Sequence, residues 1–296
     1  MRPPKNRWSH ARRATYIDAA TMRPGRLGFE GRNGGSATTM ERYRRMESGW
    51  CRNQWRIKLL MAAAVVAVPL AAGALAQGIA DQLAACKDEA GLAPDRITAC
   101  TRVIELATDD EEMRGEAYLQ RGVINETTGN REAAVKDYTE ALKLDATNSI
   151  AYFNRGNAYD QLGEHDLAIA DYTEAIKLEP SDPDIFNNRG QAYDNKGEFD
   201  KAIADYTESI RLNADNPRAF YNRGLAYANK GDHERAITDY GQAIKLEPRD
   251  AEAYASRGAA HEELGNDDAA RADFRKALEI VPDHDDAKEG LERLGN

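Results

Sequence analysis

The chain has 296 residues, of which 42% are hydrophobic and 30% are charged, enough for two compact domains or one elongated array. The net charge of −10 is divided unevenly: residues 1–58 hold 14 Lys/Arg and 4 Asp/Glu, whereas residues 77–296 hold 26 and 46. The resulting balance of −20 over the longer part argues against a nucleic-acid partner, because binding to phosphates requires basic side chains.

Residues 1–45 are rich in Arg and show no sustained apolar period. We expect them to be disordered, or to precede the true start of the protein, for which Met40 and Met46 are candidates. Their basic charge would permit a nucleic-acid-binding arm, but a disordered or mis-assigned start is the simpler interpretation.

Residues 46–76 have the pattern of a secretory signal peptide. A basic stretch precedes residues 59–76, which carry no charge and end on Ala-Leu-Ala, with small residues at both positions that a signal peptidase reads. We therefore predict cleavage before Gln77 and a periplasmic or secreted protein. An uncleaved inner-membrane anchor is the alternative, because about 20 apolar residues are just enough to span the hydrocarbon. Pro69 and the Ala-Leu-Ala ending favour cleavage.

Residues 77–112 are predicted to form a leading helical hairpin, with helices over residues 79–90 and 94–106. Cys86 and Cys100 lie at equal distances from the turn, so antiparallel helices would bring them level. In an oxidising compartment this even pair predicts a disulfide. The alternative is two reduced, buried thiols that pack as small apolar groups.

Residues 115–284 repeat one 34-residue pattern five times without an insertion. Four series recur at this interval, two of glycine, one of alanine and one aromatic: Gly122, Gly156, Gly190, Gly224 and Gly258; Gly129, Gly163, Gly197, Gly231 and Gly265; Ala134, Ala168, Ala202, Ala236 and Ala270; Tyr138, Tyr172, Tyr206, Tyr240 and Phe274. Such register over five copies indicates a repeat architecture in which each unit covers the next.

Each copy is expected to contain two helices. In the second copy the apolar spacing predicts helices over residues 150–162 and 165–178, separated by a glycine. Glycine inside a helix costs about 0.5–1 kcal/mol, so Gly156 requires a packing reason. We expect it to face Ala168, so that the two helices approach closely with tyrosines on either side.

The period and its pattern resemble the tetratricopeptide repeat (TPR) family, through Tyr152, Gly156, Tyr159, Ala168, Tyr172, Ala175 and Pro180. The resemblance implies an all-α fold, a right-handed superhelical solenoid of antiparallel helix pairs. It also implies that the first helices line a concave groove that binds a peptide or another protein. Residues 77–112 would then be a degenerate leading hairpin, and residues 285–296 a capping helix.

One departure from the family pattern concerns charge. Where many TPR units carry Leu before the first-helix glycine, this chain has Arg121, Arg155, Arg189, Arg223 and Arg257. An Asp precedes the second-helix aromatic in every copy: Asp137, Asp171, Asp205, Asp239 and Asp273. We predict structural ion pairs between the two rows, within a repeat or between adjacent repeats, as for Arg155, Arg189 and Arg223 with Asp171, Asp205 and Asp239. The Arg row is therefore not expected to be a binding stripe.

The alignment with the family places ten residues on the groove: Asn154, Asn188, Asn222, Phe153, Asn157, Asn187, Gln191, Arg218, Tyr221 and Leu225. An Asn side chain offers two donors and an acceptor, which suits an extended peptide backbone. The Asn residues could instead bond to neighbouring helices. Phe153 and Tyr221 are expected to be exposed aromatics, a type enriched at binding hot spots.

The sequence shows no catalytic, metal-binding or nucleotide-binding motif, so we expect no enzyme and no cofactor. The prediction is an exported, non-catalytic scaffold for a protein or peptide, neutral or basic because acidic residues lie near the groove. The alternative is a membrane-tethered structural or assembly factor that acts through self-association, held by an uncleaved anchor or an acylated Cys86.

Overall fold

The computed structural model describes residues 76–295, which belong to one unit, Ala64–Asn296. The expected irregular start and nearly all of the predicted signal peptide lie outside the described residues. Within residues 76–295 every regular element is a helix, and none of these helices is long and apolar enough to cross a membrane.

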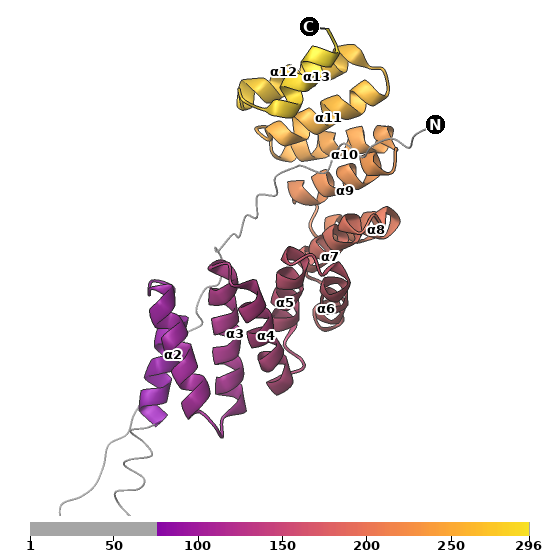
Figure 1. The fold of residues 1–296 in the computed structure, drawn as a ribbon. Coiled ribbons are helices and arrows are strands. Elements are labelled where there is room, and N and C mark those ends of the chain that lie inside the picture. Colours follow the sequence, from indigo (N-terminus) through magenta and orange to yellow (C-terminus); the bar gives the residue numbers. More distant parts are fainter. Residues whose placement is uncertain (1–75, 296) are drawn as a thin grey trace, which may run out of the picture. The chain divides into compact units, whose positions relative to one another are not determined.

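The helices follow one another as antiparallel pairs joined by short turns (Figure 1). Residues 76–87 are helical and precede α2 (Ala93–Leu106). The five repeats then supply α3 (Glu111–Thr127) and α4 (Arg131–Leu144), α5 (Ser149–Gln161) and α6 (His165–Leu178), α7 (Pro183–Asn195) and α8 (Phe199–Leu212), α9 (Pro217–Asn229) and α10 (His233–Leu246), and α11 (Ala251–Glu263) and α12 (Asp267–Ile280). A last helix, α13 (Asp285–Arg293), closes the array.

Local chemistry sets the helix ends. Gly163, which follows α5, has φ +83°, a left-handed conformation that costs glycine little and stops the helix. Before α7, the Asp182 side chain accepts a hydrogen bond from the Asp184 N–H, and Pro183 takes the first helical position. Because these signals recur in the copies, the first helices α5, α7, α9 and α11 each have 13 residues and the five second helices each have 14, whereas α3 has 17.

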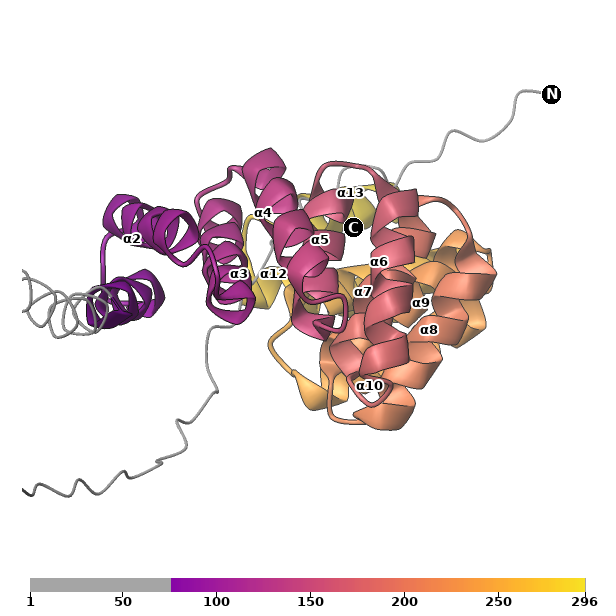
Figure 2. The same ribbon diagram turned by 90° about the horizontal axis from the view of Figure 1, so that it is seen from below.

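The helix contacts define an inner and an outer side of the array. Each helix packs on its neighbours in sequence. In both views α2, α3 and α5 lie in this order along the array (Figures 1 and 2). Each first helix, from α3 to α9, also contacts the first helix of the next pair, whereas the second helices α4 to α12 make no such contact with one another. The first helices are therefore closer together and form the inner side, as the family resemblance implied.

The small first-helix residue makes room for an aromatic ring. A Cβ added to Gly156 would lie 2.8 Å from the Tyr172 ring, closer than such atoms approach. The nearest group is thus the tyrosine of the second helix. In the fourth and fifth copies the alanine expected to face the glycine is also close, because a Cβ at Gly224 or Gly258 would lie 3.3 Å from the carbonyl oxygen of Ala236 or Ala270. Tyr172 and its counterparts are almost fully buried, so each pair is closed by one large side chain seated on a glycine.

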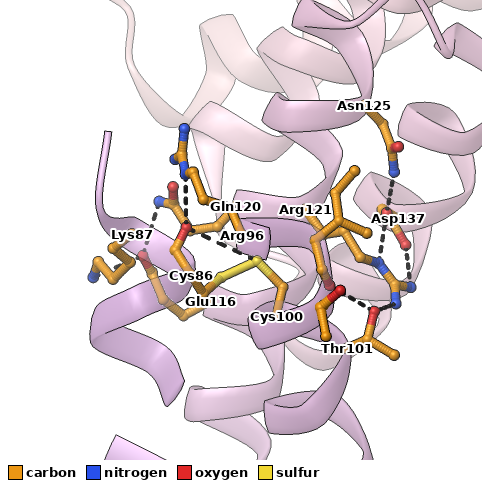
Figure 3. Close-up of a disulfide and its surroundings, with 12 residues drawn as sticks. Cys86, Lys87, Arg96, Cys100, Thr101, Glu116, Gln120, Arg121, Asn125 and Asp137 are labelled. Atoms are coloured by element: carbon orange, nitrogen blue, oxygen red, sulfur yellow. Dashed lines mark hydrogen bonds and ion pairs between the residues drawn. A yellow bond between two sulfur atoms is a disulfide. The ribbon is translucent and has the colours of Figure 1, made fainter. Parts of the chain in front are cut away.

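Both ends of the array are secured. The structure joins Cys86 to Cys100 across the leading hairpin, as predicted (Figure 3). The disulfide packs against Ile124 of α3. At the other end α13 covers Phe274 through Ala287 and Leu291. It thus closes the apolar face that the last repeat would otherwise expose.

Candidate functional site

The row of arginines forms a bidentate ion pair in every repeat. Arg155 donates from Nε and Nη2 to the two carboxylate oxygens of Asp171, at 2.7 and 2.8 Å. The same geometry joins Arg121 to Asp137, Arg189 to Asp205, Arg223 to Asp239 and Arg257 to Asp273. The hydrogen bond that Arg121 donates to Asp137 raises the pKa of Arg121. Because both charges are paired within the same repeat, we call these five Arg–Asp pairs the ion-pair framework, which holds the two helices of each repeat together.

Three of the five guanidiniums also reach the preceding repeat, and Arg121 reaches Thr101 of the leading hairpin. Arg155 Nη1 donates to the Thr139 hydroxyl at 3.0 Å, and Arg189 and Arg223 bond Thr173 and Thr207 in the same way. The sequence reasoning missed these threonines, although they recur every 34 residues just after the aromatic position. One arginine therefore fixes its own helix pair and its register on the pair before.

A chain of amides runs across the inner side of α5, α7 and α9. We call Asn154, Asn157, Asn187, Asn188 and Asn222 the amide row. Asn222 donates to Asn187 at 3.1 Å, Asn187 to Asn188 at 3.3 Å and Asn188 to Asn157 at 2.9 Å. Asn157 also accepts from the Tyr172 hydroxyl at 2.7 Å. Much of the row therefore bonds between helices, the second of the two roles considered for it.

Three of the predicted groove residues are less accessible than expected. Asn187 is 3% exposed, so it cannot present its amide to a partner directly. Phe153 and Tyr221 are half-buried rather than exposed, with ring centroids 6.0 Å from Tyr172 and 5.6 Å from Tyr240. Burial raises the pKa of Tyr221. These aromatic rings mainly pack against the second helices of their repeats. The alignment could not show this, because it gives the position of a residue along the helix but not how deeply its side chain is buried.

The accessible part of the inner side is polar with one apolar member. Asn154, Gln191 and Leu225 are partly exposed on α5, α7 and α9, and Arg218 is exposed at the start of α9. Within the described residues, the side chains of Asn154 and Gln191 have no hydrogen-bond partner. Together with the unused donors and acceptors of the amide row, they offer hydrogen bonds to a ligand without demanding a charge.

Acidic side chains flank this surface. The second residue of successive first helices is Asp184, Arg218, Glu252 and Asp286, so three of four carry negative charge. Burial raises the pKa of Asp184, while Arg218 opposes that shift. Burial also raises the pKa of Glu252, with further repulsion from Asp286 and relief from His284, whose Nε2 lies 3.3 Å away. A cationic group placed here would relieve this repulsion.

The described residues contain no cluster of His, Cys, Asp and Glu arranged to hold a metal ion.

The family model described as TPR repeat matches residues 115–163, 156–197, 195–231 and 226–265, and the model described as Tetratricopeptide repeat matches residues 251–284. Together these matches span the five copies and more than half of the chain. No curated protein matches the chain.

Similar solved structures include two that are described as TPR proteins. A crystal structure of MamA is 28% identical, with a TM-score of 0.53 over 62% of this chain and 96% of that one. YrrB, described as a TPR protein with an unusual peptide-binding site, is 23% identical, with a TM-score of 0.56 over 66% and 98%. The C-terminal part of a TPR repeat-containing protein from Cytophaga hutchinsonii is 22% identical, with a TM-score of 0.57 over 68% and 80%. The last two likenesses show the fold alone.

Proposed function

Because the chain belongs to the tetratricopeptide repeat family, we propose that it is a non-catalytic scaffold that binds a partner protein segment along the inner side of its first helices. The observation that carries this proposal is the row of half-exposed polar side chains on α5, α7 and α9 that the framework does not use. Asn154 and Gln191 are its clearest members.

An extended segment suits this surface better than a compact ligand. The accessible groups are spread over three contiguous first helices, one helix per repeat, and the amide row runs between them. A peptide backbone exposes alternating donors and acceptors, which such amides can satisfy. YrrB is described as having a peptide-binding site, but at 23% identity it supports the fold, and the proposal therefore rests on this chain's own residues.

The acidic flank favours a neutral or basic segment. Asp184, Glu252 and Asp286 border the surface and Arg218 is the one cation among them. A strongly acidic partner would meet like charges, which increases the cost of binding. We further propose that the partner is met in the cell envelope, because the signal-like segment and the Cys86–Cys100 disulfide both fit an exported protein.

A matched pair of triple variants tests the surface. Asn154→Ala/Gln191→Ala/Arg218→Ala removes inner polar groups, and Thr238→Ala/Gln242→Ala/Lys245→Ala removes exposed groups on the outer helix α10. After crosslinking in cells, the proteins recovered with the inner variant should be depleted, while the outer variant should match the wild type. Equal recovery by both variants would show that the inner side is not the binding surface.

The location has its own test. N-terminal sequencing of the protein from fractionated cells should give a start at Gln77 in the soluble envelope fraction. A protein retained in the membrane with the apolar segment intact would instead favour a tethered factor, and self-association could then be measured on that form.

A further inference from the structure

A hollow lies on the opposite side of the array from the amide row, between the second helices α2 and α4. Its volume is about 440 Å³, and the first helix α3 forms its floor. The lining residues are Ile97, Tyr118, Arg121, Asn125, Ala133, Lys136, Asp137 and Glu140. Neither the ion-pair framework nor the proposed inner surface accounts for it.

The repeat register shows what is missing from this place. Asn125 occupies the position that holds Tyr159, Tyr193 and Tyr227 in the next three copies. In the second copy the Arg155 guanidinium lies 5.9 Å from the centre of the Tyr159 ring. Arg155 also has the Tyr152 ring at 5.7 Å, so it contacts two tyrosines. The first copy keeps the arginine and the first of these rings, Tyr118 at 5.5 Å, but has no tyrosine at the position of the second.

A second truncation coincides with the first. Ala133 stands where the next copies have Leu167, Lys201 and Arg235. Lys201 lies 5.2 Å over the Tyr193 ring, and Arg235 lies 4.5 Å over the Tyr227 ring. The first copy therefore lacks both the ring and the side chain that covers it, and both shortened residues line the hollow.

The rest of the first-copy site is complete. Arg121 makes the bidentate pair with Asp137 at 3.0 and 2.7 Å and bonds the Thr101 hydroxyl at 2.9 Å. Asn125 donates to Asp137 at 2.9 Å, so its amide is held against the ion pair (Figure 3). The guanidinium is thus fixed in the position that, in the second copy, also faces the Tyr159 ring.

We propose that this hollow binds an aromatic side chain of a partner protein, with tyrosine as the best match, in the place that the chain's own tyrosine fills in the following repeats. The ring lies against the Arg121 guanidinium, where the cation attracts the π system. Ile97 and Ala133 supply apolar walls, and the exposed Lys136 ammonium at the rim can donate to a phenol oxygen. This site is separate from the inner surface and does not depend on it.

A titration with a minimal probe tests the site directly. The probe is N-acetyl-tyrosinamide, with N-acetyl-leucinamide as the non-aromatic control, added to the isotopically labelled full-length protein. The readout is the arginine Nε–H resonances. The Arg121 resonance should shift and saturate with the tyrosine probe at roughly millimolar concentration, as expected for one ring in an open site. Arg155 and Arg189, whose ring positions are occupied, should not move.

The chain's own repeats supply the control variant. Asn125→Tyr/Ala133→Leu gives the first copy the residues of the second and should abolish the Arg121 shift. If that variant does not fold, Ala133→Arg can replace it, because it changes one partly exposed residue to the one that the fourth copy has there, Arg235. This variant should weaken the Arg121 shift severalfold. The proposal is overturned by an unmoved Arg121 resonance, by equal shifts at Arg121 and Arg155, by equal shifts with the leucine probe, or by a shift that survives in the folded variants.

Discussion

The repeated Arg–Asp pair makes a quantitative prediction about stability, best tested at Asp171. Its side chain is 8% exposed, and that of Arg155 is 17% exposed. Removing one partner of a buried ion pair costs about 3–5 kcal/mol, because the other charge stays buried without compensation. Without Asp171, Arg155 still donates a hydrogen bond to the Thr139 hydroxyl and keeps some contact with water. We therefore expect Asp171→Ala to lower the free energy of unfolding by about 3 kcal/mol, the lower end of this range.

The control is an acid with an equally short but exposed contact. Asp166 lies 2.5 Å from the Lys196 ammonium, and its side chain is 83% exposed. Exposed pairs contribute about 0–1 kcal/mol, so Asp166→Ala should change stability by roughly 0.5 kcal/mol or less. Both variants remove one carboxylate from the same helix, α6. Asp166 lies in the first turn, where a negative charge also stabilises the helix, so the excess cost at Asp171 is a lower bound on the effect of burial.

The assay is urea-induced unfolding followed by helical circular dichroism, with amide hydrogen exchange on α5 and α6, because a repeat array can lose one part before another. A double variant, Arg155→Leu/Asp171→Ala, places at this position the apolar residue that many family members carry. It should recover part of the loss, because no buried charge is left unpaired. If Asp171→Ala unfolds at the same urea concentration as Asp166→Ala, the ion pairs do not support the framework.

Three further predictions concern packing, covalent linkage and pH. Gly156→Ala should lower stability by about 1–3 kcal/mol through overpacking against the facing ring, whereas Gly241→Ala, with only a 3.7 Å contact, should be neutral or slightly stabilising in thermal unfolding. Reduction or double alanine replacement of Cys86 and Cys100, 14 residues apart, should cost about 3 kcal/mol and increase hydrogen exchange in the leading hairpin first; unchanged exchange there would contradict this. Burial raises the pKa of Glu126, so ionisation of this carboxyl lowers the free energy of unfolding as the pH rises. Glu126→Gln should therefore raise the urea midpoint near neutral pH, and by less near pH ~4. A stabilisation by Glu126→Gln that increases on acidification would contradict a raised pKa.

Period and spacing predicted the fold closely. The helix of residues 165–178 and the capping helix were both expected, because glycine, proline and apolar spacing act locally and repeat five times. The Arg–Asp rows were visible for the same reason. Their bridging threonine was also periodic, but it was overlooked because threonine is unremarkable on a helix surface.

The candidate site was harder to predict. Family alignment placed Asn187 and Asn188 on the same side, but one is buried and the other half-exposed, because depth depends on how far successive helices approach. The partners of an amide are also set in three dimensions, so the bond from Asn222 to Asn187 could not be assigned from spacing. The hollow beside Asn125 corresponds to a break in a tyrosine series of the sequence. Its binding role could be inferred only from the structure, in which Arg155 contacts the Tyr159 ring of the second copy.

The central claim is that a protein partner lies along the inner side of the first helices. Its most direct test places a photo-crosslinking amino acid at Gln191 on α7 in living cells, with Gln242 on α10 as the matched outer position. We predict a discrete adduct from Gln191 that is lost when Asn154 and Arg218 are replaced by alanine, and none from Gln242. Adducts of equal yield from both positions, or an adduct from Gln191 that survives those replacements, would contradict the account.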